Sequence, residues 1–276
     1  MMNIPVLDPK GPIALAEMHV MVITVVLCAI VVIPVFFLLF YFAWRYRAGS
    51  PHASALHLPD WDHDNRAAEF SWWLVPTIII VVLAIIAWQS THALDPYKPL
   101  PGDVPAITVD VVALDWKWLF IYPAEGIASV NKVEFPAGTP VHFYLTADAP
   151  MNSFWIPALA GQIMVMPGMT TQLNVMADNP GTYNGMSANI SGEGFSGMSF
   201  TAESVSQDDF DAWVASAKSG STPLDRSSYA ALSAPSSYLP VAYYGTIDND
   251  LFDSILIKYM ATSSSVGGMD MGMHMP

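Results

Sequence analysis

Two long segments without charged residues constrain this chain more than any other feature. No Asp, Glu, Lys or Arg occurs in residues 18–44 or in residues 70–94. At about 1.5 Å of rise per residue, a helix over residues 20–44 spans roughly 40 Å, which exceeds the roughly 30 Å of a bilayer's hydrocarbon core. Two runs of this length predict membrane-spanning helices over residues 20–44 and 70–91, rather than two buried helices of a soluble protein.

The composition agrees with a membrane protein and excludes two other classes. Hydrophobic residues make up 53% of the 276 residues and charged residues only 12%, against roughly 25% charged in soluble domains. Such a hydrophobic chain is not intrinsically disordered. Its net charge of −14 repels phosphate backbones and argues against nucleic-acid binding. The first run is also longer than the hydrophobic region of a typical signal peptide, so we interpret it as a retained span.

The basic residues predict how the spans are oriented. Residues 45–69 contain three arginines, whereas the N-terminal segment, residues 1–19, contains only Lys10. From Asp95 onward there are six basic and eighteen acidic residues. Because short loops rich in Lys and Arg stay in the cytoplasm, residues 45–69 form the predicted cytoplasmic loop. We expect a multi-pass protein of a bacterial inner membrane, with both termini and a large C-terminal domain on the periplasmic side.

Short β-branched and aromatic runs predict an all-β domain over residues 106–205, after a Pro-rich linker over residues 92–105. Pro, Gly, Asn or Asp separates most of these runs. Seven or eight strands in about 100 residues are typical of a β-sandwich or barrel. The predicted strands cover residues 107–114, 116–122, 132–135, 141–146, 154–156, 162–166, 170–176 and 199–205.

The pattern changes after residue 205. Phe210, Trp213, Val214 and Ala217 recur at helical spacing, and a second helical stripe begins at Leu251. These patterns predict a helical C-terminal extension over residues 206–261. The last residues, 262–276, show no core pattern, and we expect them to be a disordered Met-rich tail.

Two spans followed by an exported β-sandwich resemble subunit II of haem-copper terminal oxidases. Four motifs carry the resemblance, and together they are specific although each alone is weak. It covers about residues 6–260 and implies a two-helix transmembrane hairpin, an all-β cupredoxin-like sandwich and short C-terminal helices. The motifs are Glu69-Phe70-Ser71-Trp72 followed by Pro76, Ser153-Phe154-Trp155-Ile156-Pro157, Pro167-Gly168-Met169, and Gly181-Thr182-Tyr183-Asn184-Gly185.

The resemblance also implies where copper would be held. Members that oxidise cytochrome c bind a dinuclear copper centre through two cysteines at Cys-x-x-x-Cys spacing, two histidines, a methionine and a backbone carbonyl. Here Ser187 and Ser191 stand at the cysteine positions, Asn152 and Phe195 stand at the histidine positions, and only Met198 matches a ligand. A serine hydroxyl cannot replace a bridging thiolate, and the one cysteine of the chain lies in the first apolar run. We therefore expect no cofactor in this chain and no docking of cytochrome c.

A sandwich without copper resembles subunit II of cytochrome bo-type ubiquinol oxidases, as do residues 7–11, 115–123 and 194–198. The resemblance implies a non-redox subunit of a proton-pumping ubiquinol oxidase that reduces dioxygen to water. It places haems, copper and ubiquinol in a catalytic subunit I, with further small membrane subunits and the lipid bilayer as partners. Members usually carry a lipidated cysteine before the stretch at Leu7. None is present here, so either a leader is missing from this sequence or the two spans alone anchor the chain.

Glu69 is the candidate site residue on the cytoplasmic side. In the family, the matching glutamate is associated with the entrance of a proton pathway into the catalytic subunit. The alternative is an interfacial carboxylate that favourably begins a helix. No residue of this chain is predicted to be catalytic.

Two further sets of residues have open interpretations. Asn152, Ser187, Ser191 and Phe195 are expected to fill a vacated site by packing, rather than to form an accessible pocket.

The tail contains thioethers and an imidazole that suit Cu(I), although a disordered tail with accidental methionines is the simpler interpretation. If the tail binds copper, the chain is instead a membrane-anchored copper-delivery or assembly factor for a terminal oxidase. A cytochrome c oxidase subunit is a third alternative, against which the missing cysteine pair argues. These weak metal-ligand candidates are Met269, Met271, Met273, His274 and Met275.

Overall fold

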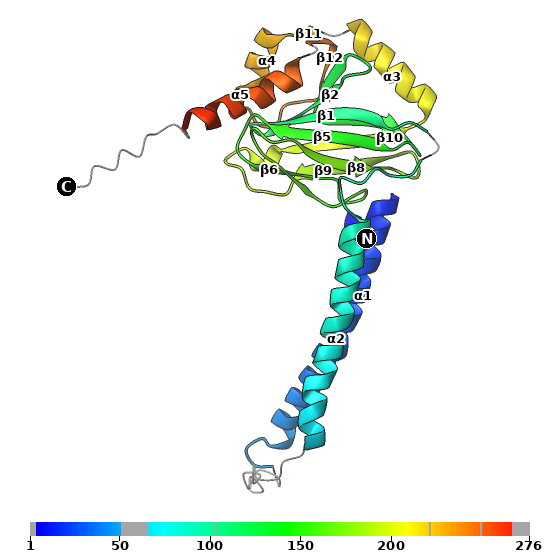
Figure 1. Ribbon diagram of the computed structural model, residues 1–276, viewed down its shortest axis with the longest axis vertical. Coiled ribbons are helices and arrows are strands. Elements are labelled where there is room, and N and C mark those ends of the chain that lie inside the picture. The colour runs from blue at the N-terminus through cyan, green and yellow to red at the C-terminus, as the bar shows by residue number, and fades with distance from the viewer. Residues whose placement is uncertain (1–3, 51–65, 103, 221, 249, 267–276) are drawn as a thin grey trace, which may run out of the picture. The chain divides into compact units, whose positions relative to one another are not determined.

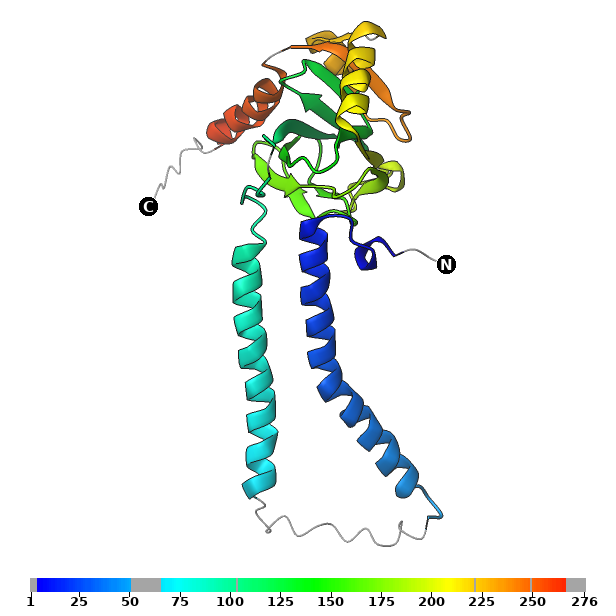
Figure 2. The ribbon, with the colours of Figure 1, turned by 90° about the vertical axis from the view of Figure 1, so that its right-hand side faces the viewer.

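The computed structural model forms two compact units, which we describe separately (Figures 1 and 2). One unit comprises residues 18–95, and the other comprises residues 1–17 together with residues 96–276. The residues that the structure describes are 4–50, 66–102, 104–220, 222–248 and 250–266.

Two long apolar helices make up most of the first unit. Helix α1 covers Pro12–Arg45 and helix α2 covers Arg66–Ala93. Both are long and apolar enough to cross a membrane, and their most apolar stretches bury no residue within the protein. Large apolar side chains such as Phe37 and Trp73 are exposed, as side chains that face lipid would be. Both helices begin before the predicted spans because the apolar run marks only the part that fits hydrocarbon, whereas a helix continues through polar residues.

The domain that follows the two helices is a sandwich of two sheets. Seven strands form one sheet in the order β11-β12-β3-β2-β1-β5-β8, and five form the other in the order β4-β10-β9-β6-β7. The predicted fold class, a two-helix hairpin with an all-β cupredoxin-like sandwich and short C-terminal helices, is confirmed. The strands of the sandwich proper are β1 (Ile107–Leu114), β2 (Lys117–Tyr122), β3 (Ile127–Val130), β4 (Lys132–Pro136), β5 (Val141–Ala147), β6 (Asn152–Trp155), β7 (Ile163–Val165), β8 (Thr171–Val175), β9 (Gly181–Ser187) and β10 (Ser199–Val205).

Aromatic rings fill the space between the two sheets. The ring of Phe154 lies 5.2 Å from that of Trp118, 5.4 Å from that of Phe143 and 4.9 Å from that of Phe200, between centroids. Gly185 is required beside them, because a Cβ atom at this position would lie 2.0 Å from the Phe200 ring. These contacts explain why the sequence pattern predicts these strands, since each ring occupies an inward-facing position of its strand.

The C-terminal extension, here residues 206–266, adds strands as well as helices. It contains α3 (Gln207–Gly220), β11 (Thr222–Leu224), α4 (Arg226–Ser233), β12 (Ala242–Ile247) and α5 (Leu251–Val266). The expectation of a purely helical extension was wrong, because β12 pairs with β3 and β11 pairs with β12. Residues 262–266 are helical rather than disordered, and residues 267–276 lie outside the described residues.

A second hydrophobic core lies on the face of the seven-stranded sheet that points away from the five-stranded sheet. There Leu119 and Val130 of the sheet pack with Leu232 of α4 and Ile255 of α5. The extension therefore covers an apolar sheet face that would otherwise be exposed to water.

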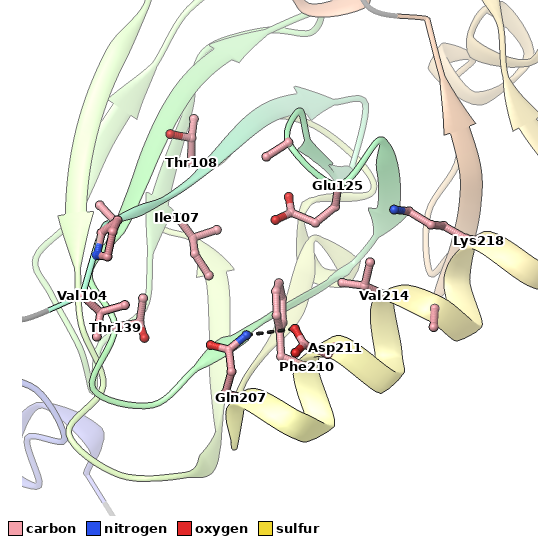
Figure 3. Close-up of a pocket in the computed structure, with 14 residues that line it drawn as sticks. Val104, Ile107, Thr108, Glu125, Thr139, Gln207, Phe210, Asp211, Val214 and Lys218 are labelled. Carbon is pink, nitrogen blue, oxygen red and sulfur yellow. Dashed lines mark hydrogen bonds between the residues drawn. The ribbon is translucent and has the colours of Figure 1, made fainter.

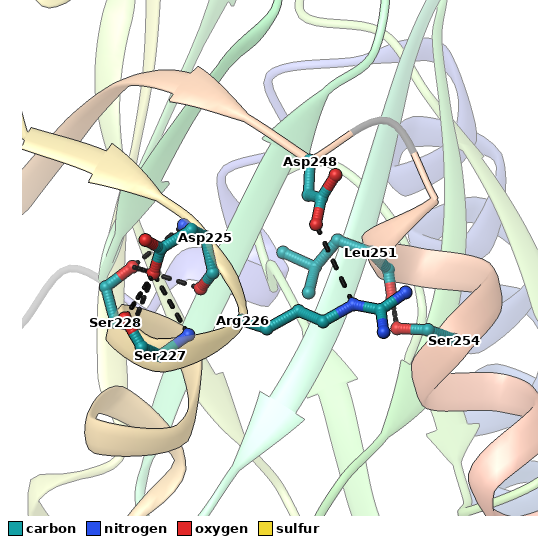
Figure 4. Close-up of polar contacts among 7 residues, drawn as sticks. All are labelled: Asp225, Arg226, Ser227, Ser228, Asp248, Leu251 and Ser254. Carbon is teal, nitrogen blue, oxygen red and sulfur yellow. Dashed lines mark hydrogen bonds and ion pairs between the residues drawn. The ribbon is translucent and has the colours of Figure 1, made fainter.

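Helix α4 begins at a well-defined cap (Figure 4). The carboxylate of Asp225 accepts hydrogen bonds from the backbone N–H groups of Ser227 at 3.0 Å and Ser228 at 2.8 Å. The Ser228 hydroxyl in turn accepts a hydrogen bond from the Asp225 N–H at 2.8 Å, which completes a capping box. Arg226 forms a longer, exposed ion pair with Asp248 at 3.8 Å. This cap fixes the start of a helix only eight residues long.

The N-terminal residues pack against the sandwich within the same unit. The backbone N–H of Lys10 donates to Ala158 O at 2.8 Å, and the N–H of Gly161 donates to Glu17 Oε1 at 3.0 Å. The segment that leads into α1 is therefore part of the same unit as the sandwich.

Candidate functional site

The five positions that the resemblance assigned to copper ligands lie together at one end of the sandwich. The hydroxyl of Ser187, the last residue of β9, donates to Asn152 Oδ1 at 3.0 Å, and its backbone N–H donates to Met198 O at 3.1 Å. Ser191 Oγ lies 4.0 Å from Met198 Sδ, and the Met198 N–H donates to Phe195 O at 3.0 Å. A continuous series of contacts therefore joins all five residues.

The chemistry of this cluster is neutral and its polar groups bond to one another. Asn152, Ser187 and Met198 are buried. The Ser187 hydroxyl also reaches Asn189 O at 3.2 Å, and the Asn152 amide donates to Pro150 O at 2.8 Å. Copper needs thiolate and imidazole ligands, and these five side chains offer two hydroxyls, an amide, a thioether and a phenyl ring. The residues therefore do not fit a dinuclear copper centre. The described residues also hold no group of three or more His, Cys, Asp or Glu side chains that could bind a metal.

Trp116 covers one side of this cluster. It lies in the turn between β1 and β2 with a backbone φ of 62°, which is unusual for an aromatic residue. Its indole N–H donates to Ser191 O at 3.4 Å. A Cβ atom at Gly194 would lie 2.4 Å from the indole ring, so glycine is needed there. Trp116 therefore packs closely against the segment that contains Ser191 and Gly194.

Asp148 binds the C-terminal extension to the sandwich beside this cluster. Its carboxylate accepts hydrogen bonds from Tyr229 of α4 at 2.7 Å, Lys258 of α5 at 2.6 Å and Tyr259 of α5 at 2.5 Å. The side chain is only 2% exposed. Burial alone would raise the pKa of Asp148, but the hydrogen bonds from Lys258 and the two tyrosines outweigh it and hold the pKa below its usual value.

Lys117 is a second buried charged residue that reaches the extension. It is 0% exposed, and its ammonium group donates to Ala234 O at 2.8 Å, Ser236 Oγ at 2.6 Å and Asp115 O at 3.3 Å. Burial lowers the pKa of Lys117, and the charge of Asp115 opposes that effect. Sequence analysis identified neither Lys117 nor Asp148 as important. The available signal was that each charge lies within a predominantly apolar stretch, Asp148 alone and Lys117 two residues after Asp115.

Comparison with known proteins gives consistent matches over nearly the whole chain. The family model described as cytochrome c oxidase subunit II, periplasmic domain, matches residues 106–205, and the COX Aromatic Rich Motif matches residues 218–263. The chain is 49% identical to the cytochrome bo(3) ubiquinol oxidase subunit 2 of Pseudomonas putida over 257 residues, covering 93% of this chain and 81% of the relative. It is 46% identical to the corresponding subunit of Pseudomonas aeruginosa, covering 91% and 75%. It is also 46% identical to the ubiquinol oxidase subunit 2 of Acetobacter aceti, covering 97% and 87%.

The chain belongs to the ubiquinol oxidase subunit 2 family. The cupredoxin-like domain with five neutral side chains at one end is thus the sandwich of a subunit 2, and the residues around Asp148 and Lys117 join it to the aromatic-rich motif. The motif supplies Tyr229, Lys258 and Tyr259, the three partners of Asp148.

This subunit 2 also contains an open cavity of about 690 Å³, distant in sequence from the five positions (Figure 3). The start of β1, the turn after β2 and helix α3 line it. Glu125 contributes one buried carboxylate oxygen that has no hydrogen-bond partner within the described part of the chain, whereas Asp211 accepts a hydrogen bond from Gln207 at 2.9 Å. None of the predicted site residues within the described part of the chain lines this cavity.

One segment of the sandwich contains almost no charged residues. Between Asp148 and Glu193 the sequence contains a single charged residue, Asp178. Exposed apolar side chains from this segment lie on or beside the strands β6, β7 and β9, and Ile190 is 81% exposed. The other exposed members are Met151, Met164, Met169 and Met186. We call these five residues the methionine surface.

The remaining predicted residues lie elsewhere. Glu69 is exposed in the first turn of α2, where a carboxylate interacts favourably with the helix N-terminus. The candidates of the Met-rich tail, residues 269–275, lie outside the described residues.

Proposed function

We propose that this chain is the non-redox subunit II of a proton-pumping ubiquinol oxidase that reduces dioxygen to water. The observation that carries the proposal is the 49% identity over 93% of the chain to a cytochrome bo(3) ubiquinol oxidase subunit 2. The neutral side chains at the five positions support it, because a membrane quinol needs no copper centre on an exported domain. Haems, copper and ubiquinol then belong to a catalytic partner subunit, which supplies the redox chemistry.

The two helices anchor the chain in the bacterial inner membrane. The excess of arginine in residues 45–69 supports a cytoplasmic position for this loop and a periplasmic position for the sandwich and both termini. In this orientation the sandwich caps the exported face of the catalytic subunit, and the helices pack against it within the bilayer.

The methionine surface is the part of the sandwich best suited to this capping role. Charged residues are depleted at the centres of protein interfaces, and methionine is enriched there. A surface with five exposed apolar side chains and little charge has both properties. We expect it to contact the catalytic subunit.

The proposal is tested by purifying the chain with its partners in a mild detergent. We expect a haem-containing subunit to co-purify at one copy per chain, with oxygen consumption driven by ubiquinol and not by reduced cytochrome c. A chain that purifies without haem, or a complex that oxidises cytochrome c, would contradict the proposal.

Glu69 is proposed as an entry point for protons. Its exposed carboxylate at the start of α2 can hold a proton at the cytoplasmic end of the span. Glu69→Gln keeps the size of the side chain but removes its acid, so quinol-driven turnover in the assembled complex should fall. Arg66→Gln, in the same helical turn, is the matched control. Unchanged turnover and proton pumping in Glu69→Gln would assign the residue to helix stabilisation alone.

The Met-rich sequence of residues 269–275 favours one second candidate function, copper delivery to a terminal oxidase. A delivery factor leaves its client, whereas a subunit remains at one-to-one stoichiometry. Deletion of residues 268–276 should lower the copper content of the oxidase if delivery is the function. Normal copper content and assembly after the deletion would exclude it.

A further inference from the structure

The C-terminal extension contacts three loops, and each of these loops borders the five-residue cluster. Asp148 lies in the turn before β6, which begins at Asn152, and it binds α4 and α5. Lys117 directly follows Trp116, the residue that covers Ser191, and it binds the segment after α4.

Tyr238 makes the third contact. Its hydroxyl lies 2.9 Å from Ser196 Oγ, and a Cβ atom at Gly197 would lie 3.0 Å from its ring. The ring therefore packs closely against the short helix Phe195–Gly197, which separates Ser191 from Met198. The backbone of Tyr238 has a φ of 56°. A residue other than glycine adopts this conformation only when its surroundings enforce it.

The three loops are also joined to each other. The side-chain amide of Asn189 donates to Met151 O at 2.9 Å, and the backbone N–H of Ala188 donates to Ser153 O at 2.9 Å. A displacement of the turn at Asp148 is therefore transmitted to the segment after β9.

The contacts within the cluster are too weak to fix these loops alone. A neutral hydrogen bond such as that between Ser187 and Asn152 contributes roughly a tenth of what a bound structural metal contributes. The contacts to the extension include two buried charged groups, which need all of their partners.

We propose that the C-terminal extension is a strap that holds these loops in place and so performs the cross-linking that a metal would otherwise provide. Lys117, Asp148 and Tyr238 are its positioning residues. Because Met151 and Ile190 lie on the strapped loops, the strap also sets the shape of the methionine surface. This last consequence rests on the proposed function, since that surface is expected to meet the catalytic subunit.

The test is hydrogen–deuterium exchange of the full-length chain in detergent. The amides of Gly197 and Met198 are protected reporters, because they donate to Gly194 O and Phe195 O, each at 3.0 Å. Asp148→Asn weakens the contact with α5 and should speed exchange in residues 186–198 by about fivefold or more, while β1 stays protected. Fivefold is the factor that corresponds to about 1 kcal/mol.

Two further variants keep the test decisive. Tyr238→Phe changes one exposed side chain, which the fold tolerates, and should speed exchange at residues 195–198 by about fivefold, for one lost hydrogen bond. Arg226→Ala is the matched control, because it removes an exposed ion pair of the same extension that does not touch the loops. Faster exchange confined to residues 251–260 in Asp148→Asn, with residues 186–198 unchanged, would overturn the strap.

Assembly provides a readout that separates the strap from the proposed function. If the wild-type chain co-purifies with haem and Asp148→Asn yields less complex, both are supported. If the wild-type chain binds no haem but the loops still lose protection in Asp148→Asn, the strap stands and the proposed function fails. If assembly is normal in Asp148→Asn and the loops keep their protection, the strap fails alone.

Discussion

The two faces of the seven-stranded sheet are held in different ways. Its inner face packs against the five-stranded sheet through large rings, among them Trp118 and Phe120, with no buried charge between them. Its outer face packs against the extension through aliphatic side chains, and beside this second core Lys117 and Asp148 are buried with directional partners.

This difference indicates that one face contributes mainly to the stability of the domain and the other mainly to the position of the C-terminal extension. A ring core gains free energy in proportion to buried area and tolerates small shifts, whereas a buried charge requires one geometry. The inner face therefore supplies most of the folding energy, and the outer face determines where the extension lies.

Loss of a central ring should cause the largest effect. Phe154→Ala removes a fully buried ring that contacts at least three others, and should lower the free energy of unfolding by about 3–5 kcal/mol. Phe154→Leu, which fills most of the volume, is the control and should cost less than half as much. Denaturant unfolding of the purified chain in detergent measures both. Similar losses in the two variants would show that the packing of the rings adds little beyond the presence of an apolar side chain.

Asn131 lies between β3 of the seven-stranded sheet and β4 of the five-stranded sheet. Its side chain accepts a hydrogen bond from the backbone N–H of Trp118 at 2.9 Å and donates one to Leu239 O at 2.8 Å. The backbone φ of Asn131 is 57°. Asn131→Ala loses both bonds and places alanine in a left-handed conformation, so we expect a loss of about 2–4 kcal/mol. Asn131→Gly loses only the bonds and should be about 1 kcal/mol more stable than Asn131→Ala. Equal stability of the two variants would mean that the conformation costs nothing.

The sequence predicted the inner face well because its signal is local. Alternating apolar residues mark strands such as Val141–Ala147, and two uncharged runs mark the helices. The strands β3 and β9 were missed because they consist largely of small or polar residues, and glycine occurs twice in β9. The resemblance pointed to five positions that lie together in the structure, although the sequence alone does not show which of their atoms bond.

The contacts of the outer face could not be predicted from the sequence, because they join residues that lie far apart along the chain. Lys117 and Asp148 meet partners more than 80 positions away, and no periodicity encodes such a contact. Strand β12 follows a region rich in serine and proline, and it pairs with the edge of β3. Tertiary context decides such segments.

Asp110 on the outer face should respond to pH in a defined direction. Burial, and next the carboxylate of Asp253, raise the pKa of Asp110 to about 6, against about 3.9 in an unfolded chain. The folded state therefore binds this proton more tightly, so the contribution is fully present below about pH 4 and is lost as the pH rises through 6. Asp110→Asn removes the penalty. Because water partly screens this carboxyl, we expect about 1 kcal/mol, or a rise in Tm of roughly 2–4 °C, at pH 7.5.

Thermal unfolding of the purified chain at pH 7.5 and pH 4.5 tests this expectation. The gain of Asp110→Asn should shrink at the lower pH, and Asp253→Asn should give a smaller gain because its charge is the lesser cause. A gain in Tm that is equal at both pH values would show that the charge of Asp110 does not affect the stability of the folded chain.

The cap of α4 should give the smallest effect, because Asp225 is solvent-exposed. Asp225→Ala leaves the N–H groups of Ser227 and Ser228 to water, and should lower Tm slightly. The hydrogen bond from the Ser228 N–H is the main cause that lowers the pKa of Asp225 to about 2, followed by the side chains of Ser227 and Ser228. The contribution of this carboxylate is therefore present above about pH 4 and is lost as the pH falls towards 2.

Asp225→Asn distinguishes the cap from its charge, because the amide oxygen accepts the same hydrogen bonds at every pH. This variant should approach the wild-type chain as the pH falls to about 2 and lie slightly below it near pH 7. Because α4 carries Tyr229, a partner of Asp148, a poorly started helix should also loosen the strap, which exchange at residues 186–198 would report. A change in Tm without any change in that exchange would show that the aliphatic contacts of the second core suffice to place α4, and that the outer face resembles the inner one more than we infer.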